Sequence, residues 1–217
     1  MALAQFSLFH GLSQDVLELL ERGCTGQTFA RSVLLFDIGD PVDGLYMVQS
    51  GCVKLYAMSK DGREHILSVH GAGESLAEWS VFLEAHTVSA RSLETSRILM
   101  VNKNALLGGL RADGPLAMRL MGAMASHADH AVNTIVDLTL RSARERLCHH
   151  LEMLVDASRP GAQTVTLKTS HANLASMLGL TAETLSRSLR QLSIEGVVSL
   201  AGRRRIVIKD LARLKAT

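Results

Sequence analysis

The most specific chemistry in this sequence lies near its C-terminus, where apolar residues recur at helical spacing. Glu183, Ser186 and Arg187 fall on the outer face, near the start of a helix predicted over residues 182–195. Glutamate can accept a hydrogen bond from a cytosine amine, arginine can donate two to guanine, and serine can reach bases or phosphates. These side chains could therefore read base pairs in the major groove of duplex DNA.

Two short helices must position those side chains. Ser170 is the expected N-cap of the first helix, and Gly179 is expected to end that helix with a positive φ. Thr181 can cap the second helix and belongs to the predicted DNA-binding set. The inner faces of both helices are apolar and carry Leu174, Ala175, Leu178, Leu185, Leu189 and Leu192. This pattern predicts a helix-turn-helix whose second helix enters the groove.

A basic segment follows the second helix. Residues 196–208 predict two strands around a tip that carries Arg203, Arg204 and Arg205, which are suited to phosphate contacts. Alone, the three arginines could form a solvated turn; with the two helices they complete a winged helix-turn-helix. Residues 137–217 hold 13 Lys and Arg against 7 Asp and Glu, a net charge of +6. Residues 1–136 hold 10 against 14, a net charge of −4, so the basic excess is concentrated where a polyanion would bind.

From about Pro115 to Asp156 the apolar residues recur every three or four positions, which predicts a long helix with Pro115 in its first turn. Two seams follow its length, which implies two neighbours: its own domain and a partner helix. One seam consists of Leu120, Met124, His127, Ala131, Thr134 and Leu138. The seam assigned to dimerisation consists of Met118, Met121, Ala125, Ala128, Val132 and Ile135, and continues to Thr139. A core helix within one domain is the alternative. Asp137, Thr139 and Leu140 mark the expected hinge before the DNA-binding part.

The residue pattern of the N-terminal half is typical of a β protein. A helix over residues 13–22, with Ser13 as its expected N-cap, precedes short strands at residues 44–49, 53–56, 65–69 and 97–101. Asp61-Gly62 is the strongest hairpin signal in the chain. Many short strands at this spacing favour a barrel or sandwich over a parallel α/β sheet.

Composition excludes several classes of protein. Of the 217 residues, 47% are hydrophobic and 20% are charged, which suits a folded core. No apolar stretch reaches the about 18 residues that a membrane-spanning helix needs, and no basic segment precedes an apolar one as in a secretion signal. Cys24, Cys52 and Cys148 are far apart, so neither a disulfide framework nor a cysteine-ligated metal is expected. We expect a cytoplasmic protein without membrane association.

The chain resembles the cyclic-AMP receptor/fumarate–nitrate regulator (CRP/FNR) family of bacterial transcription factors over nearly its whole length. The segments that carry the resemblance are residues 39–56, 61–67, the long helix and 174–187. It implies an α+β fold: an N-terminal β jelly-roll barrel like a cyclic-nucleotide-binding domain (residues 1–112), a dimerisation helix (113–138) and a C-terminal winged helix-turn-helix (139–217). It further implies a homodimeric regulator, not an enzyme, whose partners are palindromic double-stranded DNA, a small-molecule or gas effector and RNA polymerase.

The recognition helix resembles one branch of the family in particular. Glu183, Ser186 and Arg187 match the Glu-x-x-Ser-Arg pattern of the fumarate–nitrate branch, which implies a TTGAT-type half-site. Ala182 stands where the cyclic-AMP receptor has an additional arginine. A TGTGA-type half-site is therefore not expected.

In the family's cyclic-nucleotide binders, a glutamate holds the ribose hydroxyl and an Arg-Ser pair holds the phosphate. Glu78 and Ser89 match two of these positions, but Val88 replaces the arginine and Ala77 replaces the glycine before the glutamate. The direction of nearby Arg91 is undetermined. A buried phosphate would lack its counter-charge, so cyclic AMP is not the expected effector. The expected effector pocket comprises Leu76, Glu78, Trp79 and Ser89.

The oxygen-sensing branch binds an iron–sulfur cluster through N-terminal cysteines. No cysteine precedes Cys24 here, so no such cluster is expected. The remaining resemblance is to the nitric-oxide-responsive dissimilatory nitrate respiration group, whose members can use haem, although Phe6 and Ser7 replace that group's paired histidines. Haem b is then the candidate cofactor. The imidazoles in or near the barrel that could bind it are His10, His65, His70 and His86, and spacing does not select among them.

Other functions remain open from the residues alone. A regulator of the same fold could respond to a cyclic nucleotide or another small ligand. A cupin-like enzyme would need converging metal ligands, yet His65 and His70 fall on opposite faces of one strand. An interaction module without DNA contact would use the basic tip for another partner. Effector, target genes and the choice between activation and repression do not follow from the sequence.

Overall fold

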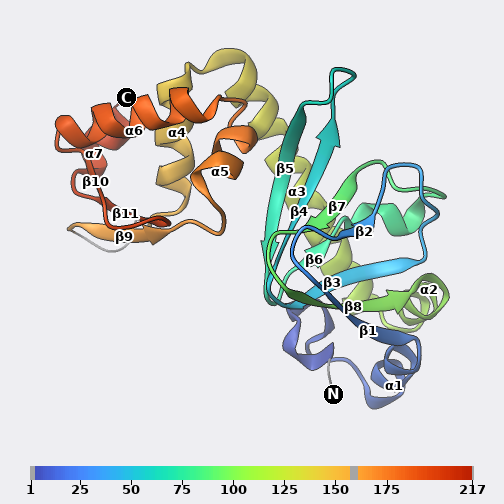
Figure 1. The fold of residues 1–217 in the computed structure, drawn as a ribbon. Coiled ribbons are helices and arrows are strands. Elements are labelled where there is room, and N and C mark those ends of the chain that lie inside the picture. The colour runs from blue at the N-terminus through green and yellow to red at the C-terminus, as the bar shows by residue number, and fades with distance from the viewer. Residues whose placement is uncertain (1–2, 157–160, 217) are drawn as a thin grey trace. The chain divides into compact units, whose positions relative to one another are not determined.

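The computed structural model describes residues 3–156 and 161–216 (Figure 1). The chain divides into two compact units, one ending at His130 and the other beginning at Ala131. This division falls within one long helix, α3 (Gly114–Leu140). The sequence placed domain boundaries at 112/113 and 138/139 instead, and that three-part division remains a prediction.

The first unit contains two antiparallel sheets of four strands each. One sheet has the order β1 (Cys24–Phe29), β8 (Ser96–Asn102), β3 (Gly44–Ser50), β6 (Ser75–Leu76), and the other β2 (Leu34–Phe36), β7 (Ser89–Ser92), β4 (Cys52–Met58), β5 (Glu64–Gly71). Most neighbours within a sheet are distant in sequence, which is typical of a jelly roll. The predicted barrel or sandwich of short strands is confirmed.

The predicted hairpin joins β4 to β5, as Figure 1 shows. Gly62 takes a φ of +79°, a conformation that costs glycine little. The Ser59 N–H donates to the Arg63 carbonyl at 2.8 Å and closes the turn. Asp61-Gly62 therefore forms the turn that local chemistry indicated.

Short helices flank the sheets of the first unit. They are η1 (Leu3–Gln5), η2 (Ser7–Phe9), α1 (Gln14–Arg22), η3 (Glu78–Phe82) and α2 (Lys103–Ala112). Ser13 is the N-cap residue of α1, as expected, but its side chain makes no capping hydrogen bond. Asn102 does cap α2, because its Oδ1 accepts from the Ala105 N–H at 2.9 Å.

Two apolar clusters form the core of this unit. One lies between the sheets and includes Phe36, Val53, Leu55, Leu76 and Ala90. The other joins α1, α2 and the sheet that contains β3 and β8 to the start of α3, where Leu116 and Leu120 are buried. Burying each such side chain contributes about 1.5–3 kcal/mol. One side of α3 is thereby packed against its own unit.

The second unit is a small α+β module with its own core. Its elements are α4 (Ala143–Met153), β9 (Gln163–Thr166), α5 (His171–Met177), α6 (Ala182–Ile194), β10 (Val198–Leu200), β11 (Arg205–Ile208) and α7 (Leu211–Lys215). Its antiparallel sheet has the order β10-β11-β9. Ser142 and Glu145 form a capping box at the start of α4, which separates α4 from α3.

None of the helices among residues 3–156 and 161–216 combines the length and apolar character needed to cross a membrane.

Candidate functional site

The predicted helix-turn-helix is formed by α5 and α6. Ser170 caps α5 by accepting from the Asn173 N–H at 3.3 Å, and Thr181 caps α6 by accepting from the Thr184 N–H at 3.1 Å. Gly179 has a φ of +62°, and an added Cβ would lie 2.7 Å from Leu138 Cδ2. A larger residue would therefore meet both backbone strain and a clash at the turn.

The outer face of α6 is open to solvent. Glu183, Ser186 and Arg187 are exposed, whereas Leu185, Leu189 and Leu192 on the opposite face are buried. Arg190 is also exposed and lies one turn beyond Glu183, Ser186 and Arg187 on the same face. Sequence reasoning left Arg190 out, although its spacing from Arg187 indicated this placement. The four side chains form a polar stripe along the helix.

The wing lies between β10 and β11, which pair antiparallel. Arg203 and Arg204 are on its tip, Arg205 begins β11, and all three are exposed. The Ala201 N–H donates to the Arg205 carbonyl at 2.9 Å and closes the tip. Three guanidinium groups on one short hairpin suit the phosphates of a nucleic acid.

The C-terminal end of α6 is fastened to α4 and α7. Arg144 donates to Glu195 through both terminal nitrogens, with Nη1 2.9 Å from Oε1. Arg213 Nη1 donates to the Glu195 carbonyl at 2.9 Å. Hydrogen bonds from Arg144 and Gln191 lower the pKa of Glu195 to about 2. These residues hold the recognition helix in place, and no local pattern could have paired residues 51 positions apart.

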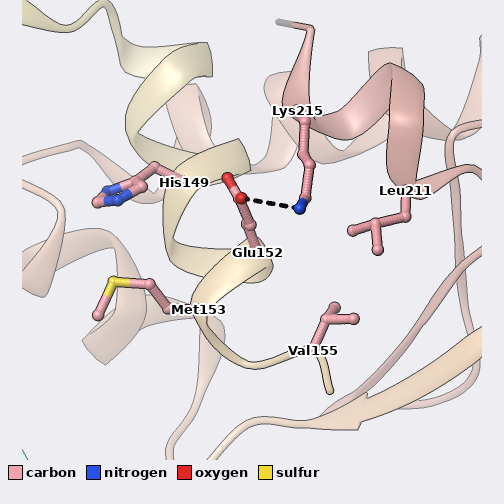
Figure 2. A pocket seen from close by; sticks show the side chains of 6 residues that line it. All are labelled: His149, Glu152, Met153, Val155, Leu211 and Lys215. Carbon is pink, nitrogen blue, oxygen red and sulfur yellow. Dashed lines mark ion pairs between the residues drawn. The ribbon is translucent and has the colours of Figure 1, made fainter. Parts of the chain in front are cut away.

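A cleft of about 260 Å³ lies between α4 and α7 (Figure 2). Its lining residues are His149, Glu152, Met153, Val155, Leu211 and Lys215. Lys215 Nζ lies 3.5 Å from Glu152 Oε1, and His149 Nδ1 lies 3.0 Å from Asp137 Oδ2. The polar side chains of this cleft thus have partners within the protein, and none of the predicted site residues lines it.

The face of α3 assigned to dimerisation is uncovered in the single chain. Met118, Met121, Val132 and Ile135 are 65, 53, 58 and 61% exposed, and Ala125 and Ala128 are also exposed. Apolar side chains in a continuous helical stripe are unusual on the surface of a monomer. The other seam begins with Leu120, which is buried in the first unit.

The residues of the predicted effector pocket have different surroundings in the structure. Leu76 is buried between the sheets, while Glu78 and Trp79 lie together at the start of η3. Ser89 instead donates to Asp37 Oδ1 and accepts from the Ile38 N–H at 3.2 Å. The hydrogen bond from Ser89 lowers the pKa of Asp37. The Ser89 hydroxyl is therefore bonded to the loop after β2.

The structure resolves the direction of Arg91. Its Nη2 donates to the Tyr56 hydroxyl at 3.0 Å, whereas its neighbour Ala90 belongs to the core between the sheets. Val88, which stands at the position of the phosphate-binding arginine, is buried in that core. Val88 carries no charge and Arg91 is bonded to Tyr56, and the exclusion of cyclic AMP as effector stays a prediction.

The histidines of the first unit differ in their surroundings. His86 is 2% exposed and stacks on Phe36 with ring centroids 3.7 Å apart. Neither of its ring nitrogens has a hydrogen-bond partner among the described residues, and burial lowers its pKa. His70 Nε2 lies 2.7 Å from Ser68 Oγ, His65 is partly buried and His10 is exposed.

Two parts of the chain match known domain families. Residues 27–113 match the cyclic nucleotide-binding domain and residues 145–217 match the Crp-like helix-turn-helix domain. The chain is 26% identical over 216 residues to the CRP-like cAMP-activated global transcriptional regulator of Mycobacterium tuberculosis, covering 98% of this chain and 96% of that protein. It is 30% identical over 188 residues to the anaerobic regulatory protein of Pasteurella multocida, covering 85% of this chain and 68% of that protein.

A solved structure shows the same fold. FixK2 from Bradyrhizobium japonicum superposes with a TM-score of 0.77 at 26% identity, covering 89% of this chain and 96% of that one. The similarity spans both units, so the jelly roll and the winged helix belong to one shared architecture.

Proposed function

The chain belongs to the CRP/FNR family of DNA-binding transcription regulators, and we propose that it acts as a homodimer on a palindromic operator with TTGAT-type half-sites. Members of this family regulate transcription and are not enzymes. The observation that carries the proposal is the open face of α6, where Glu183, Ser186 and Arg187 are exposed on a capped helix. The basic wing beside it supplies phosphate contacts.

Matched arginine substitutions test this division of roles. Binding of the full-length protein is measured by fluorescence anisotropy on a TTGAT palindrome, a TGTGA palindrome and a scrambled duplex at several salt concentrations. Arg187→Ala should weaken specific binding by about 1–3 kcal/mol and spare most non-specific binding. Arg204→Ala should weaken binding to all three duplexes alike and reduce the salt slope by about 1. An equal loss for Arg187→Ala on operator and scrambled DNA would contradict the proposal.

Dimerisation is proposed to occur through the exposed seam of α3. A dimer would place two recognition helices about 34 Å apart, which matches successive major grooves on one face of DNA. Val132→Glu places a charge in the seam and should yield a monomer that no longer retains the operator. Ser126→Glu, at an exposed position outside the seam, is the control. Sedimentation equilibrium showing a stable Val132→Glu dimer would exclude this interface.

We propose nitric oxide, sensed through haem b, as the effector. His86 is the imidazole to test, because both of its ring nitrogens are buried without hydrogen bonds. Protein atoms cover these nitrogens, so haem binding requires the loop that carries His86 to open. Haem-reconstituted protein should show a Soret band that shifts with nitric oxide and is lost in His86→Ala but kept in His65→Ala. Micromolar binding of cyclic AMP by calorimetry would instead favour a cyclic-nucleotide regulator.

A further inference from the structure

The carboxylate that the family resemblance assigns to a ligand is already engaged by the protein itself. Glu78 is 2% exposed, and its Oε2 lies 2.9 Å from Nδ1 of His127 on α3. Its other oxygen, Oε1, accepts a hydrogen bond from Ser75. Both oxygens of this buried carboxylate therefore face side chains of the same chain, Ser75 through a hydrogen bond and His127 through an ion pair, and a ligand hydroxyl would have to displace one of them.

Electrostatics favours the charged form of this pair. Burial raises the pKa of Glu78, but hydrogen bonds from His127 and Ser75 outweigh it, so that the pKa lies below its ordinary value. The hydrogen bond to Glu78 raises the pKa of His127 against the opposing effect of desolvation. An imidazolium next to a buried carboxylate removes the cost of leaving that charge unpaired.

The groups facing His127 come from two further elements and a turn. On η3 these are Glu78 and the Trp79 ring, whose centroid lies 5.4 Å from that of His127 in an edge-on arrangement. On β5 the His70 ring lies at 6.0 Å, and Glu74, in the turn before β6, adds a second negative charge that raises the pKa of His127. The anions thus outnumber the competing imidazole, which favours the protonated ring.

The position of His127 connects this pocket to the long helix. The start of α3 is anchored by Leu116 and Leu120, with Met124 packed against the same core, and His127 follows in this series one turn later. On the helix face away from the core, Met121 and Val132 are exposed in the seam assigned to dimerisation. A bond at residue 127 therefore restrains the part of α3 that is furthest from the apolar anchor in this unit.

We propose that His127 is a positioning residue that occupies the Glu78 oxygen a ligand would otherwise contact. It holds α3 against the sensor barrel in the absence of an effector. Loss of the His127 proton breaks this contact. The proposal deepens the proposed function, on which it rests for the link to DNA. It predicts that α3 is held against the barrel at pH values below the raised pKa of His127 and released above it.

Trp79 supplies the probe, since it is the one tryptophan in the sequence and lies edge-on to His127. A nearby imidazolium quenches indole fluorescence more strongly than neutral imidazole. Emission of the full-length protein should therefore rise with pH in a step whose midpoint lies above 6.5, the ordinary value for histidine. His127→Gln should remove the step, and His130→Gln, an exposed position on the same helix, should keep it.

A substitution of Glu78 tests whether the titrating histidine is paired with this carboxylate. In Glu78→Gln the midpoint should fall, because the neutral amide no longer stabilises the imidazolium. A step that persists in His127→Gln, or a midpoint that Glu78→Gln leaves unchanged, would overturn the proposal.

The functional arm measures operator affinity across the same pH range. Wild-type affinity should weaken several-fold through the fluorescence step, while the double variant Glu78→Gln/His127→Gln, which can keep a hydrogen bond but cannot titrate, should lack that component. A wild-type affinity profile identical to that of the double variant would overturn the positioning role. If the wild-type protein bound no operator at any pH, the proposed function would fail, whereas the fluorescence step would still decide whether the tether exists.

Discussion

The two units differ in the exposure of their candidate functional side chains. On α6, Glu183 and Arg187 are exposed, with the helix beneath them fixed by a cap and a buried leucine face. On η3, Glu78 is buried, accepts a hydrogen bond from Ser75 and forms an ion pair with His127. A surface that reads DNA gains from groups that are rigidly placed and unpaired. A ligand-binding site can instead use internal contacts that a ligand replaces when it binds.

The electrostatics of the two regions follows the same division. The net charge of +6 over residues 137–217 includes three exposed arginines on the wing and serves attraction to a polyanion at long range. The net charge of −4 over residues 1–136 does not describe the surroundings of Glu78, whose carboxylate faces the His127 imidazole at 2.9 Å. Net charge therefore indicates the partner of the second unit and says little about the input to the first.

The largest expected effect tests whether the two cores are separate. Leu189 is 2% exposed in the core of the second unit, so Leu189→Ala should cost that unit about 2–5 kcal/mol. Leu200→Ala, at a position 49% exposed, should change stability by no more than about 0.5 kcal/mol. Native-state hydrogen exchange should show weaker protection in α6 and unchanged protection in β8. Equal losses in both elements would mean that the units unfold together.

A smaller effect compares two helix starts. Thr181 and Ser13 occupy N-cap positions, but only the Thr181 side chain accepts a backbone hydrogen bond. Thr181→Ala should therefore destabilise α6 by about 1 kcal/mol. Ser13→Ala should alter the stability of α1 by about 0.5 kcal/mol or less. Hydrogen exchange of the first-turn amides in each helix measures the difference, and an equal loss in α1 would contradict the role of the cap.

As the pH falls, the first unit should lose stability before the second. Burial holds the pKa of His86 below its ordinary value of 6.5. Between these two pKa values His86 is protonated in the unfolded chain but neutral in the folded protein. This contribution to stability is complete above 6.5 and is lost as the pH falls through the lower native pKa. His86→Phe, which keeps the stacking on Phe36, should flatten that part of the unfolding profile. A profile that keeps its full slope would show that another group titrates.

The smallest effect concerns the second unit at still lower pH. The pKa of Glu195 is lowered from 4.5 to about 2, first of all by Arg144, so the pair stabilises the protein above 4.5 and is lost between these values. Partial exposure of both side chains keeps the gain small. Arg144→Gln should reduce the loss of α6 protection over this range, as measured by hydrogen exchange. An unchanged acid profile would show that the pair is energetically neutral.

The recognition helix was predictable because its determinants are local. Caps, a positive-φ glycine and a leucine stripe act within one or two helical turns, so Thr181, Gly179 and Leu189 could be assigned from spacing. The hairpin at Asp61-Gly62 followed from the same kind of chemistry. Exposure of the α6 polar face followed in turn, since burying one helix face leaves the other open.

The surroundings of Glu78 and Ser89 could not be predicted in the same way. Ser89 matches a family position in sequence, yet its hydroxyl is bonded to Asp37 on a neighbouring loop. Spacing placed His127 only in a seam of the long helix, with no indication of its partner. Residues 78 and 127 are brought together by the packing of α3 on the first unit, which no periodicity encodes.

The sequence by itself therefore determined the elements: short strands with their turns, a long helix with an apolar seam, and a capped helix carrying Glu183, Ser186 and Arg187. Only the tertiary structure decided which side chains complete each other, as with Glu78 and His127 or Arg144 and Glu195. The physical reason is the range of the forces involved. Backbone conformation depends on neighbours a few residues away, whereas a buried charge is paired only after the strands and helices have packed together.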